Sequence, residues 1–100
     1  MVKLLQIDFP YSGAMGDEMA EGFNELAKSI SKEKGLVFKI WTENAHTQEA
    51  GGIYIFEDLT SLETYLKMHI KRLESFGVTG IRYKIFDINE PLSAITKAPL

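Results

Sequence analysis

The sequence predicts an α+β domain in which one antiparallel sheet of four strands carries two helices on a single face. Three observations support this fold class. The chain of 100 residues has the length of one domain. Short runs of strand-forming residues alternate with two longer segments that have the apolar periodicity of helices. Their order, βαββαβ, is that of the split βαβ arrangement, the ferredoxin-like fold.

The first strand is expected over residues 2–9, because VKLLQIDF is rich in strand-compatible side chains and ends before Pro10, which cannot donate to a ladder. A helix is expected from Met15 to the lysines before Gly35, which would cap its C-terminus. Apolar residues recur along it at spacings of three and four: Met15, Met19, Phe23, Leu26 and Ile30.

The middle of the chain predicts a hairpin followed by a second helix. Residues 36–43 and 51–58 have strand character and are joined by a polar turn over 44–48. Either Asp58 or a capping box of Thr60 and Glu63 would begin the helix, and Gly77 would end it. Its apolar stripe comprises Leu59, Leu62, Leu66, His69, Leu73 and Phe76.

The last strand is expected over residues 80–89 and is halted by Pro91. Residues 90–100 are expected to form a short turn followed by a tail. The sequence contains no internal repeat and no low-complexity run. Residues 1–100 are therefore interpreted as a single domain.

The composition excludes several functional classes. A net charge of −3 lacks the basic footprint of a nucleic-acid-binding module. The absence of cysteine removes disulfides, thiolate metal sites and thiol nucleophiles, and no nucleotide-binding glycine motif is present. No metal, cofactor or nucleic-acid partner is therefore expected. Because no apolar run could span a bilayer and the N-terminus lacks a signal-peptide pattern, a cytoplasmic location is expected.

The predicted strands are apolar on both faces. In the first strand, Leu5 and Ile7 are expected on one face and Leu4 on the other. In the second strand, one face is expected to carry Leu36, Phe38 and Ile40, and the other face Trp41. Two helices cannot cover both faces of one sheet. A second copy of the chain is the expected cover, so the sequence predicts a homodimer through the sheet face.

His69 is the most informative candidate catalytic residue, because an imidazole on the apolar stripe of a helix must be buried and needs hydrogen-bond partners. It is either a core histidine bonded to a backbone carbonyl or a proton-holding group in a pocket between helix and sheet. In the second case its ordinary pKa of about 6.5 would let it exchange a proton near neutral pH.

Gly51 and Gly52 begin a strand of strong sheet formers, which predicts either a simple bulge or a dent bordered by aromatic side chains. Such a dent would suit a flat ligand, with Trp41 and Tyr54 as further candidate catalytic residues. Whether Trp41 and Tyr54 share a face depends on the hairpin register, which stays open. The candidate substrate-binding residues are Gln6, Phe38, Gly51, Gly52, Tyr65 and Phe86.

Five segments, LLQIDF, KIWTE, EAGGIYIF, YLKMHIKRL and FDINEPLS, resemble in order and spacing the family known as "putative mono-oxygenase YdhR". The resemblance implies a dimeric α+β barrel, in which two ferredoxin-like sheets close on one another. It also implies kinship with oxygenases of antibiotic biosynthesis, which oxidise polycyclic phenols with dioxygen and no metal, flavin or haem. The asparagine that those enzymes use before a tryptophan has no counterpart before Trp41, so its role is not carried over.

The resemblance thus implies a cofactor-independent monooxygenase that acts on a small cyclic aromatic or phenolic compound in a pocket between sheet and helices. Two alternatives stay open. One is a dimeric module that binds or senses a small aromatic ligand without turnover. The other is a cofactor-free isomerase or lyase on the same fold, which also needs only a base and an oxyanion donor.

Overall fold

The computed structural model describes residues 1–100 and contains four strands and four helices. The strands are β1 (Lys3–Pro10), β2 (Leu36–Asn44), β3 (Glu49–Phe56) and β4 (Arg82–Asp87). The helices are α1 (Asp17–Gly22), α2 (Asn24–Ser31), α3 (Leu59–Ser75) and α4 (Glu90–Ile95). The strand and helix order of the sequence prediction is confirmed, with the first helix divided into two and a short helix added at the C-terminus.

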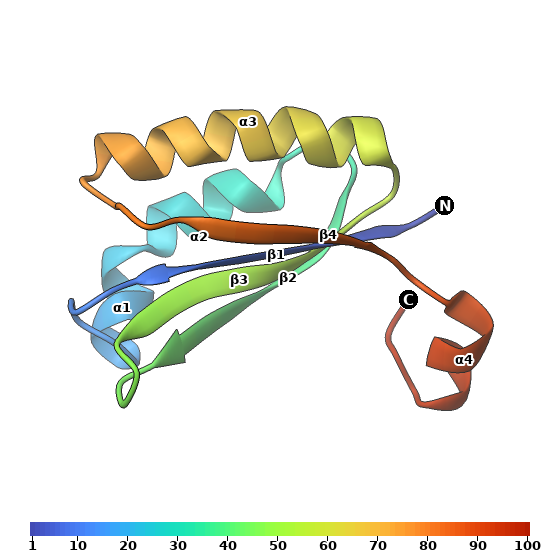
Figure 1. Cartoon of the computed structure of the whole chain (residues 1–100), viewed down its shortest axis with the longest axis horizontal. Coiled ribbons are helices and arrows are strands. Elements are labelled where there is room, and N and C mark those ends of the chain that lie inside the picture. Colours follow the sequence, from blue (N-terminus) through green and yellow to red (C-terminus); the bar gives the residue numbers. More distant parts are fainter.

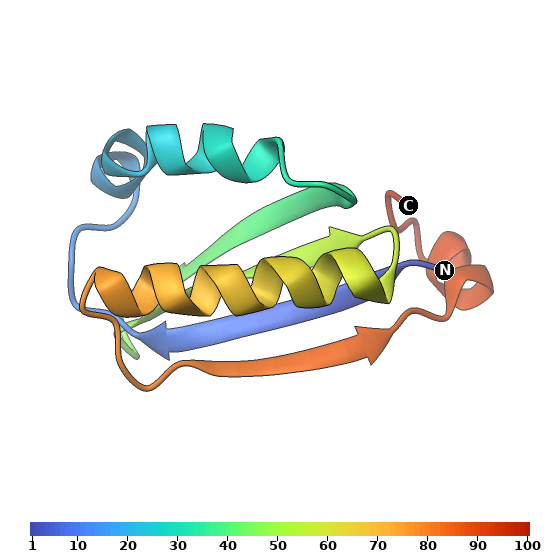
Figure 2. The same ribbon diagram turned by 90° about the horizontal axis from the view of Figure 1, so that it is seen from above.

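The four strands form one antiparallel sheet in the order β2-β3-β1-β4. Helices α1, α2 and α3 all lie on one face of this sheet, and the other face is bare (Figure 1). Seen from above, α3 runs along the middle of the sheet and α2 lies beside it, while β4 forms an uncovered edge (Figure 2). This arrangement confirms the predicted α+β, ferredoxin-like fold class.

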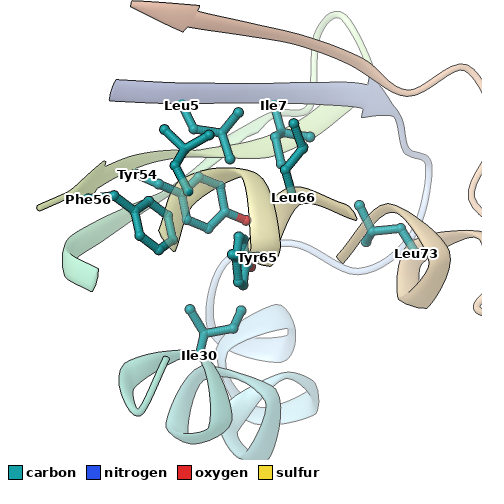
Figure 3. Packing of buried hydrophobic residues seen from close by; sticks show 9 residues of the cluster. Leu5, Ile7, Ile30, Tyr54, Phe56, Tyr65, Leu66 and Leu73 are labelled. Atoms are coloured by element: carbon teal, nitrogen blue, oxygen red, sulfur yellow. The ribbon is translucent and has the colours of Figure 1, made fainter. Parts of the chain in front are cut away.

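The core lies between the sheet and α3. Leu5 and Ile7 from β1 and Tyr54 and Phe56 from β3 point toward the helices, and Ile30 reaches the same space from α2 (Figure 3). From α3 the core receives Leu62, Tyr65, Leu66 and Leu73. The apolar stripe predicted for α3 is therefore the surface that packs on the sheet.

The start of α3 is fixed by Asp58, whose side chain accepts a hydrogen bond from the Ser61 amide at 2.7 Å. Of the two predicted caps, Asp58 is the one observed, and Thr60 lies inside the helix. Gly77 follows α3 with a positive φ of 86°, as expected of a glycine that ends a helix.

Three predicted boundaries are wrong. The helix expected from Met15 is interrupted at Phe23, beside Gly22, so that α1 and α2 are separate. Strand β3 begins at Glu49 rather than Gly51, because the polar turn is shorter than the hydrophilic residues indicate. The expected C-terminal turn contains α4, since Pro91 lies in the first helical turn, where proline is tolerated.

A bulge in β2 places Leu36 on the opposite face of the sheet from the one predicted. The pairing of β2 with β3 shifts between Leu36 and Phe38, so Leu36 joins the core while Phe38 and Ile40 lie on the bare face. The prediction that these three residues share a face is therefore wrong for Leu36. Large apolar side chains on the bare face are Leu4, Phe38, Ile40, Ile53, Ile55 and Phe86.

The backbones of β1 and β3 approach so closely at Gly51 that no side chain fits there. A Cβ atom added to Gly51 would lie 1.8 Å from the Ile7 carbonyl oxygen. That oxygen belongs to the backbone of a central strand and cannot move without disturbing the sheet. This is one physical reason for a glycine at position 51 of β3.

We expect Gly51→Ala to lower the free energy of unfolding by about 3 kcal/mol or more, because the methyl group meets backbone rather than a movable side chain. Urea unfolding followed by circular dichroism measures the change. Gly22→Ala is the matched control, since a Cβ there meets nothing within 4 Å. Equal stabilities of the two variants would contradict the close approach.

Candidate active site

A cavity of about 620 Å³ lies between the helix-covered face of the sheet and helices α1, α2 and α3. Its walls come from the end of β1 and the loop that follows, from β2 and β3, and from the C-terminal half of α3 with the segment after it. This volume is within the range of small-molecule sites. Most of its lining side chains are apolar or aromatic, and among them are Trp41, Tyr54 and His69.

The strand register places Trp41 and Tyr54 on the same face. Lys39 pairs with Tyr54 and Trp41 pairs with Gly52, and directly opposed residues of antiparallel strands project to one side. The indole of Trp41 also stacks on Phe23, with ring centroids 6.2 Å apart and planes inclined by 21°. The question that the sequence left open is thus answered, and a flat aromatic wall faces the cavity.

His69 links the cavity to a hydrogen-bond chain with a fixed direction. Its Nδ1 atom accepts from the Arg72 guanidinium, with Nη2 at 3.0 Å, and its Nε2 atom lies 3.3 Å from the Tyr54 hydroxyl. Because arginine only donates, Nδ1 must be unprotonated, and a neutral ring then carries its proton on Nε2. His69 therefore donates to the Tyr54 oxygen, so the hydroxyl proton of Tyr54 is not used in this bond.

Burial sets the protonation of these groups. The pKa of His69 is lowered to about 3, first by burial and then by the positive charges of Lys39 and Arg72. Burial likewise raises the pKa of Tyr54 to about 12. At neutral pH both side chains are therefore uncharged. The expectation that His69 exchanges a proton near neutral pH fails, because its surroundings disfavour the imidazolium ion.

Lys39 is a cavity residue that the sequence analysis missed. Its Nζ atom lies 3.4 Å from the centroid of the Trp41 ring and 4.7 Å from that of Tyr54. Burial, followed by the charge of Arg72, lowers its pKa to about 7. The available signal was a lysine that alternates with Trp41 along an apolar strand, which places both side chains on one face.

The remaining predicted site residues divide between two faces of the sheet. Gly51 lines the cavity, and Gly52 lies under the Lys39 side chain, where a Cβ would come within 2.6 Å of Cε. Tyr65 is in the core beside Tyr54 and His69, and its buried hydroxyl has no hydrogen-bond partner. The predicted residues that lie on the bare face, away from the cavity, are Gln6, Phe38 and Phe86.

Gln6, Phe38 and Phe86 were therefore misplaced as neighbours of Trp41 and Tyr54. Side chains alternate between the faces of a strand, and these three have the opposite parity once the register is known. Gln6 instead donates to the Asp8 carboxylate at 3.2 Å. No three His, Cys, Asp or Glu side chains are clustered in a way that could hold a metal ion. None of the helices has the length and apolar character needed to cross a membrane.

Comparisons with known proteins agree with this fold. A family model described as "Putative mono-oxygenase ydhR" matches residues 4–99. No curated protein matches the chain. A solved structure described as a "putative antibiotic biosynthesis monooxygenase" from Deinococcus radiodurans has a TM-score of 0.58 at 15% identity, covering 89% of this chain and 93% of that one.

A second similar structure is a mutant of SnoaB, a cofactor-independent oxygenase from Streptomyces nogalater. It has a TM-score of 0.63 at 15% identity and covers 88% of this chain and 93% of its own. At this identity the two structures show a shared fold. The chemistry of the cavity must be argued from its own side chains.

The buried, neutral His69 predicts a loss of stability in acid. Between its folded pKa of about 3 and its ordinary value of 6.5, the unfolded chain binds a proton that the folded chain does not. The free energy of unfolding therefore falls as pH falls through this window. We expect the Tm of the wild type to drop further between about pH 7 and about pH 4 than that of His69→Leu.

Scanning calorimetry at several pH values measures this difference. His46→Leu, which removes the exposed histidine of the turn between β2 and β3, is the control and should keep the wild-type difference. Parallel curves for the wild type and His69→Leu would show that His69 is protonated at similar pH in both states.

Proposed function

The chain belongs to the YdhR family of mono-oxygenases, and from this premise we propose that it oxidises a small aromatic or phenolic compound with dioxygen and without a cofactor. The observation that carries the proposal is the cavity between sheet and helices. An aromatic wall, formed by Trp41 and Phe23, and a hydrogen-bond donor, the Tyr54 hydroxyl, meet there. A flat ring with one oxygen substituent fits both features.

Oxidation of a phenol to a quinone by dioxygen needs no outside reductant. Loss of the phenolic proton gives an oxyanion, which passes one electron to dioxygen, and the two radicals join as a peroxide anion on the ring. The peroxide anion takes a proton back and becomes a hydroperoxide. The hydroperoxide then loses water and leaves a quinone. The substrate gains one oxygen atom and loses two hydrogen atoms, which leave with the second oxygen atom as water.

Such a reaction requires that the protein provide an apolar cavity and stabilise the oxyanion. Arg72 holds His69, and His69 donates to Tyr54, so the Tyr54 hydroxyl is oriented to donate its own proton toward a ligand oxygen. His69 thereby acts on the substrate through Tyr54 as a positioning residue. Phe9, Met19, Leu26 and Leu73 supply apolar cavity wall.

Oxygen consumption separates this proposal from its two rivals. Phenols, naphthols and anthrones would be tested in an oxygen electrode, with product analysis in air and under nitrogen. Uptake of oxygen with quinone formation supports a monooxygenase. Product formation under nitrogen would instead indicate an isomerase or lyase, and ligand-induced melting shifts without turnover would indicate a binding module.

Tyr54→Phe tests the oxyanion donor, because it removes one oxygen atom and keeps the ring. We expect kcat/KM for oxygen uptake to fall about 10²- to 10³-fold, the effect of losing one oxyanion donor. Tyr83→Phe is the matched control, since Tyr83 is on β4, 51% exposed and outside the cavity. A folded Tyr54→Phe variant with wild-type turnover would remove Tyr54 from the mechanism.

We also propose that the chain forms a homodimer through the bare face of the sheet, as a dimeric α+β barrel. This face presents Ile40 and Phe86 with 54% and 45% of their surface exposed. A contiguous apolar surface of this kind is a liability on a soluble monomer. Helix α4, which lies beyond the end of the sheet, adds exposed Leu92 and Ile95 (Figure 1).

Light scattering at micromolar concentration tests the dimer, with a mass of twice 11.3 kDa expected for the wild type. Ile40→Glu places a charge in the proposed interface and should give a folded monomer, because burying an unpaired carboxylate is costly. Met68→Glu, on exposed surface of α3, is the control and should stay dimeric. A monomeric wild type, still folded, would contradict the proposal.

A further inference from the structure

The cavity is positively charged and contains no acid. Among its lining residues Lys39 is the one charged side chain, and neither aspartate nor glutamate contributes to the wall. Arg72, behind His69, adds a second positive charge. Neither Lys39 nor Arg72 takes part in any of the ion pairs of the structure. The charge of the cavity is therefore not balanced from within the protein.

Lys39 also has unused hydrogen-bonding capacity. Its Nζ atom contacts the faces of Trp41 and Tyr54 and is paired with no carboxylate of the protein. An ammonium group can donate three hydrogen bonds, and burial without an acceptor is unfavourable. A group that is partly buried, cationic and unpaired at a cavity wall has the properties of a ligand-binding residue.

We infer that the ligand of this cavity is an aromatic anion whose oxyanion, a carboxylate or an ionised ring hydroxyl, pairs with Lys39. The inference rests on the proposed function and narrows its substrate class from aromatic compounds to acidic ones. Lys39 lies directly over the Trp41 ring. A flat ligand beside that ring can present an in-plane oxygen to Nζ and, on its other side, meet the Tyr54 hydroxyl.

The same ion pair forms from either protonation state of the partners. An anionic ligand binds the Lys39 ammonium directly. A neutral ligand whose ring hydroxyl is more acidic than the Lys39 ammonium transfers its proton to a neutral Nζ, which again leaves an ammonium and an aryl oxide. The lowered pKa of Lys39, about 7, makes both states available near neutral pH. Lys39 thus takes the proton-accepting role that His69, with its pKa of about 3, cannot fill.

The chain carries a built-in reporter for the test. Trp41 is its one tryptophan and lines the cavity, so quenching of tryptophan fluorescence reports binding at this site. Two matched pairs of probes are compared: lawsone, a hydroxynaphthoquinone ionised at neutral pH, with its neutral methyl ether, and naphthoate with neutral naphthamide. Isothermal calorimetry provides a second reading that does not depend on the indole.

We expect the wild type to bind at least one anion more tightly than its neutral counterpart. In Lys39→Met the dissociation constant of that anion should rise about 10- to 100-fold, as for loss of one charge-assisted hydrogen bond. The neutral probes should change less than about threefold. Lys28→Met, on exposed surface of α2, is the control and should bind as the wild type does. The pair of probes that shows the larger difference in affinity between the anion and its neutral counterpart identifies the oxyanion as carboxylate or hydroxyl.

Each other outcome has a defined meaning. Equal binding of anions and neutral probes, unchanged in Lys39→Met, would overturn the inference and leave the aromatic cavity standing. Failure of every probe to bind would overturn the aromatic cavity itself, and with it the proposed function. Should Lys39→Met fail to fold, the comparison of charged and neutral probes on the wild type decides alone, and equal affinities would again overturn the inference.

Discussion

The cavity depends on the pairing of Trp41 with Gly52 across strands β2 and β3. A side chain at position 52 would project to the same face as the indole and occupy the space of the Lys39 side chain, since a Cβ would lie 2.6 Å from Cε. Without that side chain, Lys39 can extend over Trp41 and Tyr54. Gly51 serves another purpose, because it permits β3 to approach the Ile7 carbonyl. The two adjacent glycines thus have different roles: Gly52 leaves room for the Lys39 side chain, and Gly51 allows close contact between the backbones of β1 and β3.

The polar part of the site is organised by a residue that does not line the cavity. Arg72 can only donate hydrogen bonds, so it fixes His69 with Nδ1 as acceptor and Nε2 as donor to Tyr54. The same charge, together with that of Lys39 and with burial, keeps His69 neutral. The cavity therefore presents a hydroxyl donor and a cation, and no carboxylate. This pattern favours a ligand that carries or develops negative charge, which is the property needed when a phenol is activated toward dioxygen without a cofactor.

The two faces of the sheet have separate tasks because side chains alternate along each strand. The face that carries Leu5, Tyr54 and Trp41 is covered by helices and forms both core and cavity. The face that carries Ile40 and Phe86 is apolar and has no cover within the chain. An aromatic residue on the bare face, such as Phe38, cannot belong to the cavity, however close it stands to Trp41 in sequence.

The sequence by itself determined the order of the strands and helices, the apolar stripe of α3 and the position of His69 on that stripe, because these features follow from side chains a few residues apart. The tertiary structure alone decided the bulge that turns Leu36 inward, the face shared by Trp41 and Tyr54, and the burial of Lys39. It also decided that His69 stays neutral. These outcomes depend on register and on charges brought together from β2 and α3, which are distant in the chain. A local sequence pattern cannot predict such neighbours, because it does not fix the strand register. A shift of one residue in pairing exchanges the two faces of a strand.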